Sequence, residues 1–229
     1  MQSKGARPRR TEFAASYLVL LVILSLFVAR DAPARAFVTA RVGTERPLTA
    51  GFRESRVTSW ATALEPVLVA SASTGKSARI ALYDRFGDID EEARASFERI
   101  ASKDPESHPL SLRVEQVVFK AAYHFGAQRL SVVSGWRERA GKHATGDAID
   151  FRLAGAKPEA VAAYLRSLPR IGVGIYTHPG TQFVHVDVRE QSFYWIDASP
   201  PGVHWHERQL RDRSTAKRDA TYVAEMDLP

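Results

Sequence analysis

Residues 183–188, which read Phe-Val-His-Val-Asp-Val, alternate between apolar and polar side chains. This period of two is the pattern of a β-strand whose faces have different surroundings. The three valines fill one face of the predicted strand, so His185 and Asp187 lie together on the other. Strands disfavour aspartate, and burying a carboxylate without a partner is costly. An aspartate in this setting therefore points to a functional role.

A second stretch, residues 142–151, reads Lys-His-Ala-Thr-Gly-Asp-Ala-Ile-Asp-Phe. Gly146 permits a sharp bend, and beyond it the pattern alternates again, with Ala148 and Asp150 on the face opposite the core. The small side chain of Ala148 leaves room beside Asp150 for a bulkier group. The bend lets His143 fold back over the same face.

If the two predicted strands pair, His185 approaches Asp150 across the sheet. Two imidazoles and one carboxylate are a ligand set typical of catalytic zinc, with a fourth position left for water. The chain has no cysteine, so histidine and carboxylate must hold any metal. A single histidine on a strand is more often structural. Two histidines that coincide with two unusual aspartates favour a zinc site made of His143, Asp150 and His185.

These stretches also resemble a known group. The pattern His-x-x-Gly-x-Ala-x-Asp over residues 143–150 resembles the first zinc motif of the LAS superfamily of lysostaphin-type peptidases, D-alanyl-D-alanine carboxypeptidases and the hedgehog signalling domain. Residues 134–137, Ser-Gly-Trp-Arg, are similar to a Ser-Gly-Tyr-Arg stretch of the carboxypeptidase arm. Residues 183–187 resemble the second motif of its murein endopeptidase K-like branch. The resemblance covers about residues 78–202.

The resemblance implies a LAS/hedgehog-like zinc peptidase fold and zinc-dependent hydrolysis of peptide bonds in peptidoglycan stem peptides or cross-links. Zn²⁺ is the expected cofactor, and it lowers the pKa of its bound water to about 7 while polarising the scissile carbonyl. Asp187 is the expected general base, with a role as a ligand of the same metal as the alternative. Arg137 is the expected clamp for a substrate carboxylate, with a surface salt bridge as the alternative.

One departure from the resemblance favours a second hypothesis. Several relatives place a catalytic glutamate three residues before the third ligand, where this chain has Gln182, which cannot act as a base. The alternative function is therefore a non-catalytic, zinc-containing module that binds the cell wall. The first hypothesis remains a murein endopeptidase or a D,D- or L,D-carboxypeptidase.

The rest of the chain predicts an α+β fold, because helices come first and strands later, with a small, mostly antiparallel sheet flanked by helices. Apolar spacing at i, i+3, i+4 and i+7 predicts a buried helix over residues 114–125, which Gly126 ends. Further elements are expected at strands over 67–73 and 79–83, a helix over about 90–101, a strand over 130–133, a helix from Pro158 through Leu168, and strands over 171–176 and 193–196.

The N-terminus carries the features of an export signal. Basic residues gather at positions 4–10, an uncharged apolar run follows over residues 13–29, and Ala34 and Ala36 form an A-x-A site. The run is at the short end of the spanning range, so a cleaved signal and a retained membrane anchor both fit. The positive charge stays inside, which places the rest of the chain in the periplasm or cell envelope.

Four segments follow from these patterns: a signal peptide or anchor over 1–36, a linker over 37–77, a zinc peptidase domain over 78–202 and a charged tail over 203–229. The formal net charge is +6, but lysine and arginine are dispersed rather than gathered in one stripe. A nucleic-acid partner is therefore not expected. The expected partners are peptidoglycan peptides, and the membrane if the N-terminal segment is retained.

Overall fold

The computed structural model describes residues 59–138, 141–203 and 208–229. The predicted export signal over residues 1–36, including the apolar run over 13–29, lies outside the described residues. Within the described ranges, none of the helices has the length and apolar character needed to cross a membrane.

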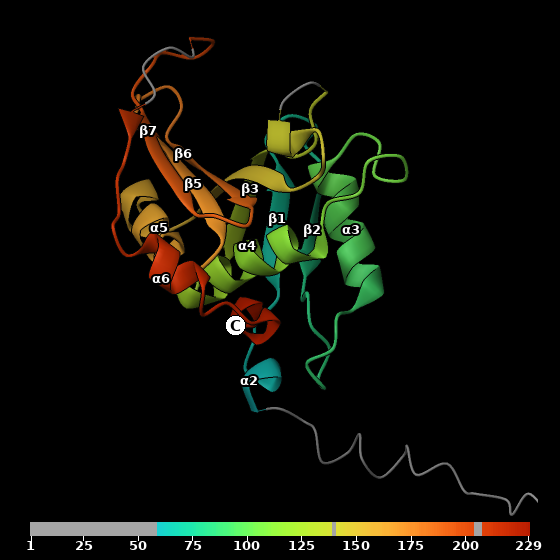
Figure 1. The fold of residues 1–229 in the computed structure, drawn as a ribbon. Helices are drawn as coiled ribbons and strands as arrows, with labels where there is room; N and C mark the ends of the chain where they lie inside the picture. Colours follow the sequence, from blue (N-terminus) through green and yellow to red (C-terminus); the bar gives the residue numbers. More distant parts are fainter. Residues whose placement is uncertain (1–58, 139–140, 204–207) are drawn as a thin grey trace, which may run out of the picture. The chain divides into compact units, whose positions relative to one another are not determined.

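Helices and strands are interspersed along the described chain (Figure 1). In order they are α2 (Ser59–Thr62), β1 (Val67–Ser71), β2 (Ser77–Ile80), α3 (Glu91–Ala101), α4 (Leu112–His124), β3 (Arg129–Ser134), the 3-10 helix η1 (Gly141–His143), β4 (Ala148–Leu153), α5 (Pro158–Leu165), β5 (Ile171–Tyr176), β6 (Phe183–Val188), β7 (Phe193–Asp197), β8 (Arg208–Gln209), α6 (Thr215–Asp219) and η2 (Ala224–Asp227).

The strands form one sheet of eight strands in the order β2-β1-β3-β4-β6-β5-β7-β8. The pairs β1–β3 and β5–β7 are parallel, and the other neighbouring pairs are antiparallel. The predicted α+β class and the mostly antiparallel sheet are confirmed. The predicted small size of the sheet is wrong, because β1 and β8 extend it from segments that were expected to be a linker and a tail.

The ends of three helices carry the residues that the sequence predicts there. The Asp90 side chain caps α3 by accepting hydrogen bonds from the backbone N–H groups of Glu92 and Ala93. Gly126 ends α4 with a φ of 56°, a conformation that glycine adopts without steric cost. Pro158 occupies the first turn of α5, where its missing N–H costs nothing.

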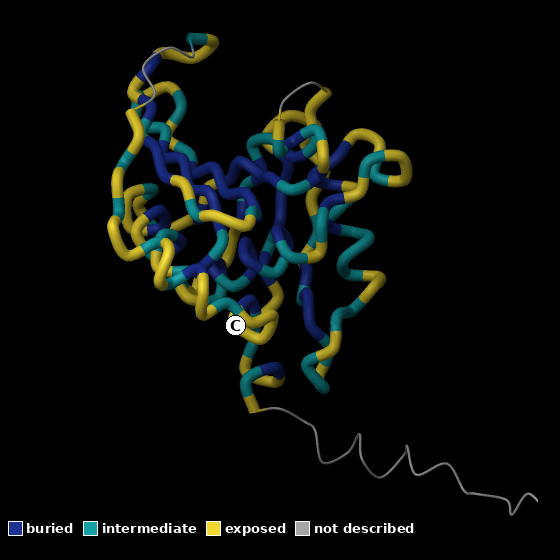
Figure 2. The backbone as a smooth tube through the Cα atoms, in the orientation of Figure 1, coloured by how far each residue is buried: buried dark blue, intermediate teal, exposed yellow. Residues whose placement is uncertain are grey.

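Helices α3, α4 and α5 pack against the apolar face of the sheet. Figure 2 shows the buried segments running through the central strands. On β4 and β6 the core-facing residues are Ile149, Phe151, Val184 and Val186. Because side chains alternate along a strand, Asp150, His185 and Asp187 lie on the opposite face of the sheet.

The outer segments belong to the same fold. The predicted linker over residues 37–77 contains β1, which lies between β2 and β3 in the sheet. The predicted tail over residues 203–229 contains β8, α6 and η2, and two of its aspartates are buried. Asp219 accepts hydrogen bonds from the backbone N–H groups of Arg170 and Ser192. Both expected domain boundaries therefore differ from the structure.

Candidate metal centre

Strands β4 and β6 are antiparallel neighbours, and their register pairs Asp150 directly with His185. The predicted approach of these two residues across the sheet is confirmed. His143 ends η1 and reaches the same place because the chain bends at Gly146, whose φ is 74°. A Cβ at Gly146 would lie 2.2 Å from the Pro109 carbonyl oxygen, so no larger residue fits the bend.

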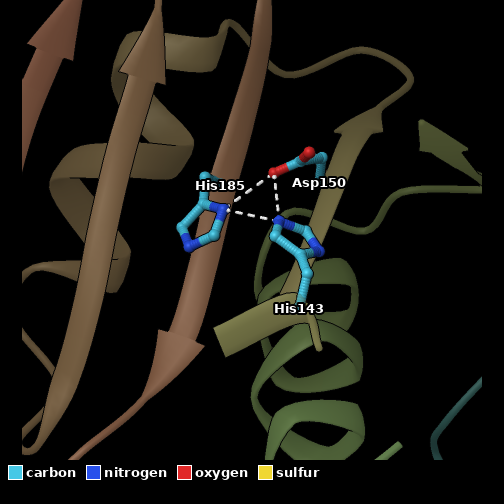
Figure 3. Close-up of side chains that lie close together, drawn as sticks. All are labelled: His143, Asp150 and His185. Carbon is cyan, nitrogen blue, oxygen red and sulfur yellow. Dashed lines mark hydrogen bonds and ion pairs between the residues drawn. The ribbon is translucent and has the colours of Figure 1, made fainter. Parts of the chain in front are cut away.

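The three predicted ligands converge on one another, as Figure 3 shows. Asp150 Oδ1 lies 2.8 Å from His185 Nδ1, and His143 Nε2 lies 3.1 Å from His185 Nδ1. His143 Nε2 lies 3.3 Å from Asp150 Oδ1. All three residues are buried. Among the described residues, histidine and carboxylate ligand atoms converge in this way only here.

These distances fit a small tetrahedral cation. Zinc bound at about 2.0–2.1 Å by four tetrahedral ligands separates the ligand atoms by about 3.3 Å. The observed separations of 2.8, 3.1 and 3.3 Å lie close to that edge length. His143 Nε2 and His185 Nδ1 also face each other, and only one hydrogen fits between these two nitrogens. Two imidazoles and one carboxylate therefore form a suitable donor set for Zn²⁺.

The second ring nitrogen of His143 fixes how the ring is oriented. His143 Nδ1 lies 2.6 Å from the Gly135 carbonyl oxygen, so Nδ1–H donates and Nε2 keeps its lone pair for the centre. A Cβ at Gly135 would lie 2.2 Å from the Ala101 carbonyl oxygen. This close packing against the end of α3 therefore requires glycine at position 135 of the Ser-Gly-Trp-Arg stretch.

Asp187 lies on the other side of the His185 ring. Its Oδ2 is 3.1 Å from His185 Nε2, whereas His185 Nδ1 faces Asp150 and His143. The Asp187 side chain is buried, and Arg189 donates to both of its carboxylate oxygens. A carboxylate in this position is separated from the ligand atoms by the imidazole ring. The role of general base stays a prediction for Asp187.

The charges at the centre shift the pKa values of its members. Burial alone would raise the pKa of Asp150, but the His143 and His185 rings beside it outweigh burial and hold this pKa well below the usual range. Burial alone would lower the pKa of His185, but hydrogen bonds to Asp150 and Asp187 outweigh it and raise that pKa. Both shifts show a site arranged around an ionised carboxylate.

Arg137 lies at the edge of the centre. Its Nη2 donates to Asp150 Oδ2 at 3.0 Å, and its side chain is 46% exposed. The structure thus brings the predicted clamp residue to a ligand of the centre while leaving part of the guanidinium open to solvent. Gln182 lies instead on the turn before β6, exposed, with a φ of 42°, and its carbonyl oxygen accepts from Arg152 Nε at 3.0 Å.

Sequence reasoning missed a set of residues next to His185. The Trp195 ring centroid lies 5.0 Å from that of His185, and a Cβ at Gly174 would lie 2.3 Å from the indole. Gly172 provides similar room for Arg189. The available signal was the alternation of glycines at 172 and 174 in a strand, since interior glycines mark a close approach by another group.

Residues 101–187 match the family model described as Peptidase M15. The matched segment contains His143, Asp150 and His185, and it confirms the resemblance to LAS-type zinc peptidases over these residues. The branch within that group stays a prediction. No curated protein and no solved structure gives a match.

Proposed function

Because residues 101–187 match the Peptidase M15 family, whose members are metallopeptidases, we propose that this chain is a zinc-dependent peptidase. We further propose that it hydrolyses peptide bonds in peptidoglycan stem peptides or cross-links. The observation that carries the proposal is the convergence of His143 Nε2, Asp150 Oδ1 and His185 Nδ1 within 3.3 Å of one another. Three protein ligands leave one tetrahedral position for the reaction.

Each side chain at the centre has a separate task. When bound, zinc supplies a Lewis acid that lowers the pKa of a water to about 7 and polarises a carbonyl. His143, Asp150 and His185 hold the ion. The Gly135 carbonyl oxygen keeps His143 Nε2 free of hydrogen, so that this nitrogen faces the centre.

Arg137 supports the choice of an acidic peptide as substrate. Its partly exposed guanidinium lies beside the centre, where it can bind a carboxylate with two parallel hydrogen bonds. Peptidoglycan stem peptides carry such carboxylates. The net charge of +6 also favours attraction to an anionic polymer such as a cell wall.

The proposed location follows from the substrate and from the N-terminal sequence. We propose export to the periplasm or cell envelope, directed by the apolar run over residues 13–29. Retention of that run would anchor the protein to the inner membrane. Fractionation of cells that express the full chain, followed by mass determination of the released protein, distinguishes cleavage from retention.

A second candidate function is a non-catalytic zinc module that binds the cell wall. Gln182 cannot act as a base, and its place on an exposed turn removes it from the centre. The Asp187 carboxylate is already paired with Arg189. Neither Gln182 nor Asp187 therefore presents a free carboxylate beside the ligand atoms, and this observation is the one that supports the binding module as the second candidate.

The test uses the purified full chain loaded with zinc. Metal content is measured by mass spectrometry, and muropeptides are then incubated with the protein, with and without a chelator. The peptidase proposal expects one zinc per chain and products that disappear with the chelator and in the His143→Ala variant. Bound zinc without products would support the binding module. Absence of zinc would contradict both functions.

A further inference from the structure

We propose that Asp187 and Arg189 form a positioning pair that holds His185 in the orientation and tautomer that binds the metal. The proposal rests on the zinc centre described above, and it assigns Asp187 neither to the ligands nor to acid–base chemistry. Three residues beyond the ligands take part: Asp187 on β6, Arg189 directly after β6, and Gly172 on the neighbouring strand β5.

The hydrogen bonds of His185 divide its two ring nitrogens. Nδ1 faces Asp150 Oδ1 at 2.8 Å, and Nε2 faces Asp187 Oδ2 at 3.1 Å. The Asp187 carboxylate is ionised beside Arg189, so it can only accept, and a neutral His185 ring that leaves Nδ1 to the metal donates its Nε2 hydrogen to this carboxylate. A neutral imidazole with its hydrogen on Nε2 has its lone pair on Nδ1. Nδ1 is the atom that faces the other two ligands.

Arg189 orients the Asp187 carboxylate, and this carboxylate in turn orients the His185 ring. Its Nε and Nη2 donate to the two oxygens of Asp187, a bidentate arrangement that sets the rotation of the carboxylate. The guanidinium carbon of Arg189 lies 5.5 Å from the centroid of the Phe193 ring, which gives the cation a second contact. The Asp187 side chain is 1% exposed, so the pair is shielded from water on the carboxylate side.

Gly172 shows that the neighbouring strand leaves space for this pair. Gly172 on β5 is the register partner of Asp187 on β6. A Cβ at Gly172 would lie 2.2 Å from Asp187 Oδ2 and 2.5 Å from Arg189 Nη2. Gly172 is not among the glycines with positive φ, so its backbone conformation does not demand glycine. The missing side chain is therefore explained by the room that the ion pair occupies.

This arrangement gives variants that separate positioning from base catalysis. A general base at position 187 predicts that Asp187→Asn binds zinc normally and loses turnover. A positioning residue predicts weaker zinc binding, because partners of metal ligands are typically worth 10–100-fold in affinity. Gly172→Ala displaces the pair without changing either member, so it tests the same contact from the opposite strand.

The first measurement is the zinc dissociation constant of the full chain, obtained by competition with a chromophoric chelator. Asp187→Asn and Gly172→Ala are expected to weaken zinc binding by about 10–100-fold. The matched control is Asp227→Asn, which changes another buried aspartate that an arginine pairs with, here Arg113 Nε at 2.8 Å. This control is expected to bind zinc like the wild type. Unchanged affinity in both test variants would overturn the proposal.

The second measurement reads the Nε2 hydrogen bond directly and needs no activity. Nitrogen-15 NMR of the zinc-loaded wild type is expected to show the hydrogen of His185 on Nε2 and protected from exchange with water. Gly172→Ala is expected to lose this protection. Rapid exchange of this hydrogen in the wild type would overturn the proposal. Because the spectrum is recorded without substrate, it tests the positioning pair even if the proposed peptidase function fails.

If Gly172→Ala does not fold, Arg189→Lys replaces it. Lysine keeps the positive charge but cannot form the bidentate contact. The expected result is zinc binding weakened at least several-fold, with the far-ultraviolet circular dichroism of the wild type retained. Wild-type zinc affinity in this variant would contradict the role assigned to Arg189.

Discussion

Asp150 on β4 and His185 on β6 face each other across two antiparallel strands, with Asp150 Oδ1 2.8 Å from His185 Nδ1. This pairing joins two sequence patterns that lie far apart in the chain into one centre. His143 completes the centre from a bend that only Gly146 permits. The sheet register therefore brings two of the three ligands together, and the bend at Gly146 brings the third.

The Asp150→Asn substitution tests the charge of the carboxylate ligand. Asparagine keeps the shape but removes the negative charge that two imidazoles surround. Zinc affinity is expected to fall by more than about 100-fold, because outer partners alone are worth 10–100-fold. Chelator competition measures the change, and Asp219→Asn, a buried aspartate that bonds Arg170 and Ser192 instead, is the control. Equal affinities for both variants would contradict the assignment.

Zinc binding should depend on pH through His185. Its pKa is raised in the metal-free protein by hydrogen bonds to Asp150 and Asp187, which outweigh burial. The metal binds only the deprotonated ring, so zinc affinity is expected to fall as the pH drops through this raised pKa, above the ordinary value of about 6.5. Calorimetry in buffers of different ionisation enthalpy should detect proton release. Affinity independent of pH between about 6 and 9 would contradict this expectation.

Arg137 is predicted to act on substrate rather than on metal. Arg137→Gln removes a charged hydrogen-bond donor, which is worth about 1.5–3 kcal/mol. We expect KM for an acidic muropeptide to rise by about 10–100-fold when the variant is kept saturated with zinc, so that weaker metal binding through Asp150 does not enter the measurement. Arg129→Gln changes an exposed arginine at the start of β3 and serves as the control. An unchanged KM at saturating zinc would contradict the role of Arg137 in substrate binding.

Glu115 should make stability depend on pH. It is fully buried on α4, and one of its oxygens has no hydrogen-bond partner among the described residues. Burial outweighs the nearby Arg94 and raises the pKa of Glu115 to about 8. The folded state therefore holds this proton more tightly than the unfolded state. The free energy of unfolding should decrease as the pH rises from about 4.5 to about 8, by a few kcal/mol.

Urea unfolding at several pH values checks this dependence. Glu115→Gln is expected to flatten it, whereas Glu92→Gln, which changes an exposed residue in the first turn of α3, is expected to leave it unchanged. The same slope in the wild type and in Glu115→Gln would assign the pH dependence to another group.

The sequence predicts the elements that carry the centre well. The strands β5 and β6 have the predicted bounds, and the alternation of apolar and polar residues places Asp150 and His185 on one face. The reason is physical: a strand with one buried face must alternate, so the face of each polar residue can be read directly. The ligand set follows from the same pattern.

Other features depend on contacts between residues far apart in the sequence, which a local sequence pattern cannot predict. Strand β1 pairs in parallel with β3, across an interval of many residues, and β8 has only two residues. Asp219 and Asp227 are buried because distant groups, including Arg113 and Arg170, donate to them. A charged segment of this kind looks like a tail in the sequence. The contact of Asp187 with Arg189, two residues later, was equally hidden.

The most direct test of the zinc centre is X-ray diffraction from crystals of the zinc-loaded full chain, measured at the zinc absorption edge. The expected result is an anomalous peak about 2.0–2.2 Å from His143 Nε2, His185 Nδ1 and one oxygen of Asp150. A peak bound to His185 Nε2 and Asp187, or a peak elsewhere with these three atoms free, would contradict it.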